Sequence, residues 1–219
     1  MSEAINAFLL GLPALFSIVN PISGAFIFGS VTEDRSTEER ANMARKVAVY
    51  SFVVMMVALW AGALVLAFFG VTLAALRVAG GFVVALTAWE LLNRPEHREA
   101  RKQEQALPAA VTEDIALFPM TIPITTGPGT MAVAVALSAS RPRDPQMFAF
   151  FVIGMSAAAA ALALAIWITY RFSDRIARLM GPGGSRTVTR LSAFLLLCIG
   201  VQILITGVVD VLEPLLRQH

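Results

Sequence analysis

The stretch VAVYSFVVMMVALWAGALVLAFF, residues 47–69, decides the class of protein, because it is long and contains no charged residue. A helix needs about 17 to 25 apolar residues to cross the hydrocarbon core of a bilayer. Five further apolar segments are similar, at residues 4–29, 76–92, 115–139, 147–170 and 191–212. A segment exposed to lipid must satisfy its own backbone hydrogen bonds. We therefore predict an all-α membrane protein with six transmembrane helices.

The overall composition supports this class. Of the 219 residues, 57% are hydrophobic and only 15% are charged, whereas a typical soluble domain has about 25% charged residues. Mean hydropathy is +0.72. The net charge is +2, and because nucleic-acid binding needs clustered Lys and Arg, we expect no nucleic-acid partner. The single cysteine, Cys198, lies in an apolar run and is expected to be a small buried hydrophobic residue.

The positions of Lys and Arg predict the orientation in the membrane. All but four of the 17 basic residues lie in three connections, residues 30–46, 93–114 and 171–190. Short cytoplasmic loops carry an excess of Lys and Arg. Both termini are therefore expected on the outer, periplasmic side of the membrane. Glu3 stands where a signal peptide would be positive, so we expect the first segment to remain as a span.

The two halves of the chain resemble each other. Each begins with a proline-broken segment, continues with an uninterrupted span and ends with a helix that opens near an arginine, Arg77 or Arg190. Because each half holds three spans, the second must insert upside down, as in many secondary transporters. We therefore predict two inverted three-helix repeats, at residues 1–94 and 115–219, joined by a charged cytoplasmic linker at residues 95–114.

Proline and glycine interrupt the first and fourth spans. Proline removes a backbone donor and glycine weakens a helix, so both spans are predicted to unwind near mid-membrane depth. Such backbone is tolerated only where it is buried in protein or lines a cavity. An isolated proline would indicate a kink, but two interruptions at matching positions indicate a binding site. The candidate substrate-binding residues are Asn20, Pro21, Ser23, Gly24, Thr125, Thr126, Gly127, Pro128, Gly129 and Thr130.

The ends of broken helices carry partial charges that suit a zwitterion. N-termini attract carboxylates, and C-terminal carbonyls attract cations. Three charged side chains are candidates for gating or structural roles. Glu90, beside Trp89, is either a proton relay or a solvated interfacial group. Arg77 and Arg190 either snorkel to the interface, gate the path or pair with carbonyls of the broken spans. No carboxylate is predicted deep in a span, so the coupling ion, H⁺ or Na⁺, is left open.

Catalysis is poorly supported by the sequence. The two histidines are His97, in a charged loop, and His219, and neither belongs to a cluster with metal-ligand spacing. The GPGG motif at residues 181–184 lacks the Lys-Ser/Thr of a phosphate loop and is expected to form a tight turn before the last span. We therefore expect no enzyme activity, no metal and no cofactor. Asp210 and Glu213 are expected to be solvated at the outer interface.

Four motifs together resemble the MarC family over essentially the whole chain: residues 20–24, 69–81, 119–130 and 190–202. The resemblance implies a six-span inner-membrane protein related to the lysine exporter superfamily, in which some members are described as neutral amino acid transporters. It implies that residues 20–24 and 126–130 face the substrate. Ser23 stands where many members have glycine, so the exact substrate stays open.

The leading hypothesis is a secondary transporter of small neutral amino acids, of the size of alanine or glycine, working by alternating access. One alternative is an exporter of another small solute or drug, whose site would be larger and lined by aromatic residues. Another is a non-transporting membrane scaffold or sensor, in which the small residues serve only helix packing. The alanine-rich residues 156–165 are expected to have this packing role, and small-residue faces would also suit a homo-oligomer.

Overall fold

The computed structural model describes residues 2–93, 100–104, 115–142 and 144–216. Most of the predicted linker, including His97, lies outside these residues. The helices are α1 (Ser2–Val19), α2 (Pro21–Val31), α3 (Thr37–Phe68), α4 (Leu73–Asn93), the π-helical η2 (Ala116–Thr125), α6 (Pro128–Ala139), α7 (Pro145–Arg171) and α8 (Ser173–Leu216). Within the described residues, five helical segments are long and apolar enough to span a membrane, or six if the bent pair of η2 and α6 is one span. The prediction of a multi-pass helical membrane protein is confirmed.

Helix α3 begins ten residues before the apolar segment that predicted it. Ser36 caps its N-terminus: the Glu39 N–H donates to Ser36 Oγ at 3.3 Å, and the Ser36 N–H donates to Glu39 Oε2 at 2.9 Å. This capping box satisfies two otherwise unpaired N–H groups. The polar residues that follow, expected to be a connection, therefore continue the helix beyond its apolar part.

Helix α8 also starts earlier than expected. It runs from Ser173 and is interrupted at Gly181, whose φ of 58° and ψ of 179° are not helical. Only glycine adopts that conformation readily. The predicted turn at residues 181–184 is thus an interruption within α8, and the apolar part that could span the membrane is Gly183–Glu213. Arg190 lies inside this helix with an exposed side chain, and not at a helix start as predicted. Cys198, on the same helix, is exposed on the surface of the bundle and not buried as predicted.

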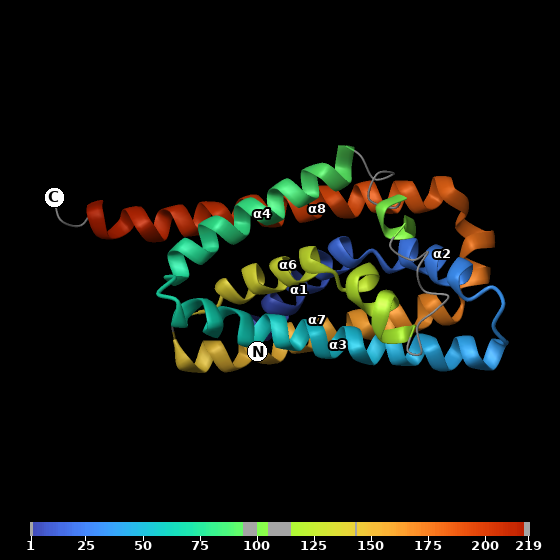
Figure 1. Ribbon diagram of the computed structural model, residues 1–219. Coiled ribbons are helices and arrows are strands. Elements are labelled where there is room, and N and C mark those ends of the chain that lie inside the picture. The colour runs from blue at the N-terminus through green and yellow to red at the C-terminus, as the bar shows by residue number, and fades with distance from the viewer. Residues whose placement is uncertain (1, 94–99, 105–114, 143, 217–219) are drawn as a thin grey trace.

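The helices form three layers (Figure 1). Helices α4 and α8 lie side by side in one outer layer, and α3 and α7 form the other. Between them lie α1, α2 and α6, which contact both outer layers, and η2, which contacts α3 and α2. Leu15, Met120 and Leu137 of this middle layer are fully buried. Both interrupted segments therefore occupy the centre of the bundle.

Small residues bring the helix backbones into close contact. Between α4 and α8, a Cβ on Gly200 would lie 2.6 Å from the Ala85 nitrogen, and one on Gly207 would lie 2.7 Å from the Val78 nitrogen. Between α1 and α7, a Cβ on Gly154 would collide with the Ala4 carbonyl oxygen. In a bilayer, helices associate through such close packing, because the hydrophobic effect does not drive helices together in lipid. Each of these interfaces joins one half of the sequence to the other.

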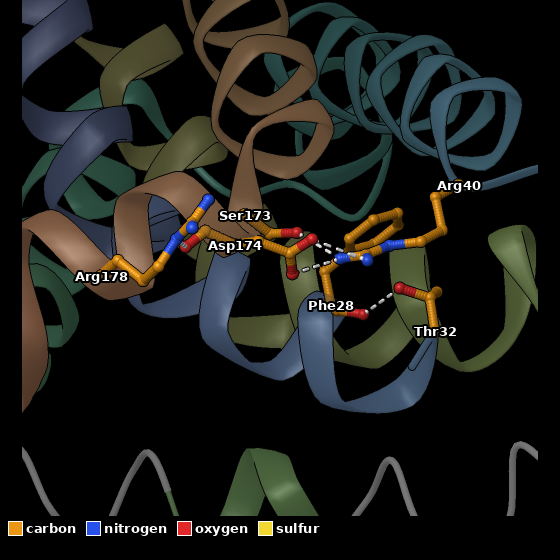
Figure 2. Close-up of polar contacts among 6 residues, drawn as sticks. All are labelled: Phe28, Thr32, Arg40, Ser173, Asp174 and Arg178. Carbon is orange, nitrogen blue, oxygen red and sulfur yellow. Dashed lines mark hydrogen bonds and ion pairs between the residues drawn. The ribbon is translucent and has the colours of Figure 1, made fainter. Parts of the chain in front are cut away.

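An ion pair ties α3 to α8 at one end of the bundle (Figure 2). Arg40 donates to both carboxylate oxygens of Asp174, at 2.7 and 2.8 Å, and to Ser173 Oγ at 2.9 Å. The hydrogen bond from Arg40 holds the pKa of Asp174 below its ordinary value. We call this end, where α3 and α8 begin, the basic end. The opposite end, where α4 begins and α8 ends, is the far end.

Candidate functional site

The first interruption is a single left-handed residue. Asn20 has φ 50° and ψ 70°, a conformation that asparagine tolerates better than most residues. Its Oδ1 accepts from the Ser23 N–H at 3.3 Å and caps α2. Pro21 follows at the start of α2, where its missing N–H costs no hydrogen bond. The Asn-Pro pair therefore ends α1 and begins α2 in one step.

The side chains at this interruption bond to α8. Asn20 Nδ2 donates to Ser23 Oγ at 2.9 Å and to Thr189 Oγ1 at 2.7 Å. Ser23 Oγ also lies 3.1 Å from Ser185 Oγ, and Thr189 Oγ1 donates to the Ser185 carbonyl at 2.9 Å. All four residues are buried. We call them the Asn20 cluster; their hydrogen bonds hold the first interruption against α8.

The second interruption is longer and less regular. In η2 and at the residue that ends it, the hydroxyls of Thr121, Thr125 and Thr126 each donate to the carbonyl five residues earlier, at 2.7, 2.6 and 3.2 Å. Pro119 and Pro123 supply no backbone donors, and the residues before them, Phe118 and Ile122, are not helical. The chain then bends by 62° into α6.

Helix α6 begins without a side-chain cap. Gly127 is its N-cap residue and Pro128 is its first helical residue. The first N–H groups of a helix lack partners within the helix, and the helix dipole makes this end partially positive. Thr130, in the same first turn, is buried. An anion could therefore bind at this end if a space is open in front of it.

Such a space is present as a cleft of about 330 Å³. Helix α4 lines it with Thr87 and Glu90, and the helical residues 100–104 line it with Arg101 and Lys102. The second interruption supplies the rest of the lining: Pro123, Ile124, Gly127, Pro128, Gly129 and Thr130. The cleft thus combines a carboxylate, two cations and an uncapped helix N-terminus.

Lys102 connects the cleft to the first interruption. Its Nζ donates to the carbonyl oxygen of Val19, the last residue of α1, at 3.2 Å. The terminal carbonyls of a helix lack intrahelical donors and carry partial negative charge. One ammonium group therefore bonds to the end of α1 while its side chain lines the cleft beside α6.

Tyr170 of α7 joins the two interruptions from another side. Its hydroxyl lies 2.8 Å from Thr125 Oγ1. Because the Thr125 hydroxyl already donates to the Met120 carbonyl, Tyr170 is the donor to Thr125. The same hydroxyl would collide with a Cβ on Gly24, and the ring stacks on Phe28 with centroids 4.9 Å apart. Tyr170 therefore needs a glycine at position 24.

The predicted site residues fall into two groups. Gly127, Pro128, Gly129, Thr130 and Glu90 line the cleft. A second group is buried by packing and internal hydrogen bonds outside the cleft lining: Asn20, Pro21, Ser23, Gly24, Thr125 and Thr126. The two groups are thus placed differently, and the lining comes from the second interruption.

Sequence reasoning missed several residues that surround these interruptions. Nothing in the sequence marked Lys102 and Arg101 as site residues, because they counted only toward the charge of their loop. Ser185 and Thr189 were assigned to a connection that is in fact helical. Tyr170 could have been noticed as the one hydroxyl-bearing aromatic at the end of an alanine-rich span.

Arg77 lies at the far end, roughly 20 Å along α4 from Glu90. It is only 8% exposed. Its Nε donates to the Ala139 carbonyl at 2.6 Å, its Nη2 donates to the Arg141 carbonyl at 2.9 Å, and its Nη1 pairs with Asp210. Asp210 was expected to be solvated; it instead pairs with this buried guanidinium. We call these contacts the Arg77 clamp, which joins α4 to the ends of α6 and α8.

These features define a multi-pass helical membrane protein with interrupted helices in its central layer. The chain belongs to the MarC family, since the family described as MarC family integral membrane protein matches residues 5–212. The inner membrane protein MarC of Salmonella typhimurium is 36% identical over 218 residues, covering 97% of this chain and 99% of that protein. The Citrobacter koseri protein of the same name is 35% identical with the same coverage. No solved structure matches the chain significantly. The resemblance drawn from the sequence is confirmed, and the protein is a multi-pass inner-membrane protein.

Proposed function

We propose that this protein is a secondary transporter that moves small neutral amino acids across the inner membrane, with the cleft as its substrate site. The observation that carries the proposal is the charge arrangement of the lining, which holds Glu90 together with Arg101, Lys102 and the uncapped start of α6. An α-amino acid presents one carboxylate and one ammonium group, which match these two kinds of group. No catalytic step and no cofactor are part of this proposal.

The lining suggests how an amino acid would bind. Its carboxylate would meet the first turn of α6, where Gly129 has a backbone N–H and Thr130 a hydroxyl. Its ammonium group would meet Glu90. Pro123 and Ile124 would contact a short apolar side chain. The volume of about 330 Å³ lies at the lower end of the range for ligand pockets, which favours a small ligand over a drug.

The two helices that follow the interruptions support the inverted-repeat arrangement. Helices α2 and α6 contain 11 and 12 residues, and each begins with proline. Their lengths of about 16 to 18 Å are roughly half of a 30 Å hydrocarbon core. Helix α2 runs to the basic end and α6 to the far end. Both interruptions would therefore lie near the middle of the membrane, in segments of opposite direction.

The packing is also reciprocal between the halves. Helix α1 packs on α7 while α3 packs on η2 and α6, and α4 packs on α8. A two-fold axis in the membrane plane would produce these exchanged pairs. The halves are therefore interleaved, and moving one repeat as a body would break every one of these contacts. We propose instead that the layer of α4 and α8 moves against the remaining helices during alternating access.

The position of the cleft along the bundle supports an assignment of the transporter's state. The basic end would face the cytoplasm, because it carries the excess of Lys and Arg, and both termini would then lie on the periplasmic side. Glu90 and Lys102 place the cleft toward that end, while the Arg77 clamp holds α4, α6 and α8 together at the far end. We propose that this structure is the inward-facing state.

Uptake and counterflow of labelled alanine and glycine in proteoliposomes test the proposal, with and without H⁺ or Na⁺ gradients. Thr130→Val and Glu90→Gln should each reduce saturable flux at least about tenfold, because each removes a hydrogen bond or charge contact to the ligand. Glu38→Gln, at an exposed site at the start of α3, is the control. Gly127 is a poor target because a Cβ there would collide with the Pro123 carbonyl oxygen. Absence of flux for both amino acids under every gradient would refute the proposal.

A further inference from the structure

A groove of about 340 Å³ lies between α3 and α7 on the surface of the bundle. It exists because three alanines, Ala48, Ala160 and Ala163, face it from the two helices, and its lining is almost entirely apolar. Neighbouring residues on the same faces, such as Val53 and Ile168, are exposed. This surface belongs to helices that span the membrane, so acyl chains are the solvent that surrounds it.

The groove starts at the membrane interface. On α3 it runs from Arg45 to Phe52, and on α7 from Trp167 back to Ala160. Each of these stretches is about 10 Å long, a third of a 30 Å hydrocarbon core. Arg45 stands just before the uncharged part of α3, and tryptophan side chains prefer the level of the lipid headgroups. The groove therefore descends from headgroup level into one leaflet.

Two guanidinium groups lie at its interfacial end. Arg45 lines the groove, and the Arg171 guanidinium lies 5.7 Å from the centre of the Trp167 ring. Among the described residues, neither arginine has an acidic partner, whereas Arg40 on the same helix as Arg45 pairs with Asp174. An anion from outside the protein could therefore neutralise both charges.

We propose that this groove is a binding site for an anionic phospholipid. One acyl chain lies in the apolar part, and the phosphodiester binds Arg45 and Arg171. A net negative headgroup fits better than a zwitterionic one, because the latter brings its own cation to the two arginines. A second copy of the protein fits less well: a two-fold contact here would bring both copies' arginines together at the same depth.

Native mass spectrometry of the delipidated protein tests the site. Phosphatidylglycerol and phosphatidylcholine with identical acyl chains are titrated against the wild type and the double variant Arg45→Gln/Arg171→Gln. Each basic residue near the membrane surface contributes about fivefold to the binding of an anionic lipid, so the double variant should bind phosphatidylglycerol about 25-fold more weakly. Its affinity for phosphatidylcholine should change little. Arg175→Gln, an exposed arginine at the same end outside the groove, is the matched control and should behave as the wild type.

A second variant tests the apolar part. Ala163→Leu fills the groove, so it should weaken binding of both lipids while the helical circular dichroism stays unchanged. Unchanged binding of phosphatidylglycerol to the double arginine variant would overturn the proposal. So would an equal loss in Arg175→Gln, which would show that only general surface charge matters. A wild-type dimer that Ala163→Leu converts to a monomer would identify a second copy as the occupant and would also overturn it.

Discussion

Breaking the Arg77 clamp should destabilise the protein from its far end. Asp210→Ala removes the carboxylate that pairs with Arg77, a residue only 8% exposed. Removing one partner of a buried ion pair costs about 3–5 kcal/mol, because the other charge is left without compensation. Arg77 would keep its hydrogen bonds to the Ala139 and Arg141 carbonyls, and the Asp210 side chain is 18% exposed, so we expect about 2–3 kcal/mol.

The assay is thermal unfolding of the purified protein in detergent at a fixed scan rate. For a chain of this size, 1 kcal/mol shifts Tm by about 2–4 °C, so Asp210→Ala should lower Tm by about 5–10 °C. The double variant Arg77→Met/Asp210→Leu should recover most of this loss, since apolar replacement of a buried pair is often nearly neutral. Glu33→Ala, an exposed acid near the basic end, is the control. A Tm within about 1 °C of the wild type for Asp210→Ala would refute the reasoning that the pair stabilises the far end.

Three further predictions concern the interruptions and the basic end. Tyr170→Phe removes the hydrogen bond to Thr125 and should cost about 1 kcal/mol, measured as a lower Tm; no change would show that the contact adds nothing. Asn20→Gly keeps the left-handed backbone but loses the bonds of the Asn20 cluster, so it should lower Tm, and Asn20→Ala, which also strains the backbone, should lower it further; full stability of Asn20→Gly would contradict a role for the cluster. Arg40 lowers the pKa of Asp174, so this pair stabilises the fold above the ordinary pKa of 3.8 and loses its contribution as the pH falls through the lowered value. The effect should be small, because the Asp174 side chain is 65% exposed. Asp174→Asn should therefore reduce Tm slightly at pH 7 and not at pH 2. Equal losses of Tm at both pH values would contradict a stabilising ion pair between Arg40 and Asp174.

The residues at which α2 and α6 begin follow from the sequence because the causes are local. Proline and glycine act on the backbone at their own positions, and Asn20-Pro21 and Gly127-Pro128 do stand where α2 and α6 begin. Their surroundings could not be predicted in the same way. The bond from Lys102 to Val19 and the bond from Asn20 to Thr189 join residues 83 and 169 positions apart. Nothing in either local sequence marks its partner.

Hydropathy likewise identified the apolar cores of the helices but not their lengths. The start of α3 depends on the capping box at Ser36, and the start of α8 depends on how residues before Gly181 pack beside α2 and α3. Hydropathy measures transfer into lipid, and a helix can continue as a polar segment outside the membrane. This is why residues assigned to connections, among them Ser185 and Thr189, prove to be helical.

The sequence alone determined the class of protein, the approximate spans and the family, because each depends on composition or on short motifs. The tertiary structure alone decided which interruption lines the cleft and which is held against α8. It also paired Arg77 with Asp210, 133 positions away, and placed Tyr170 between Gly24 and Thr125. The physical reason is that hydropathy and backbone preference act within a few residues. Burial of charges and close approach of helices depend instead on how distant segments pack.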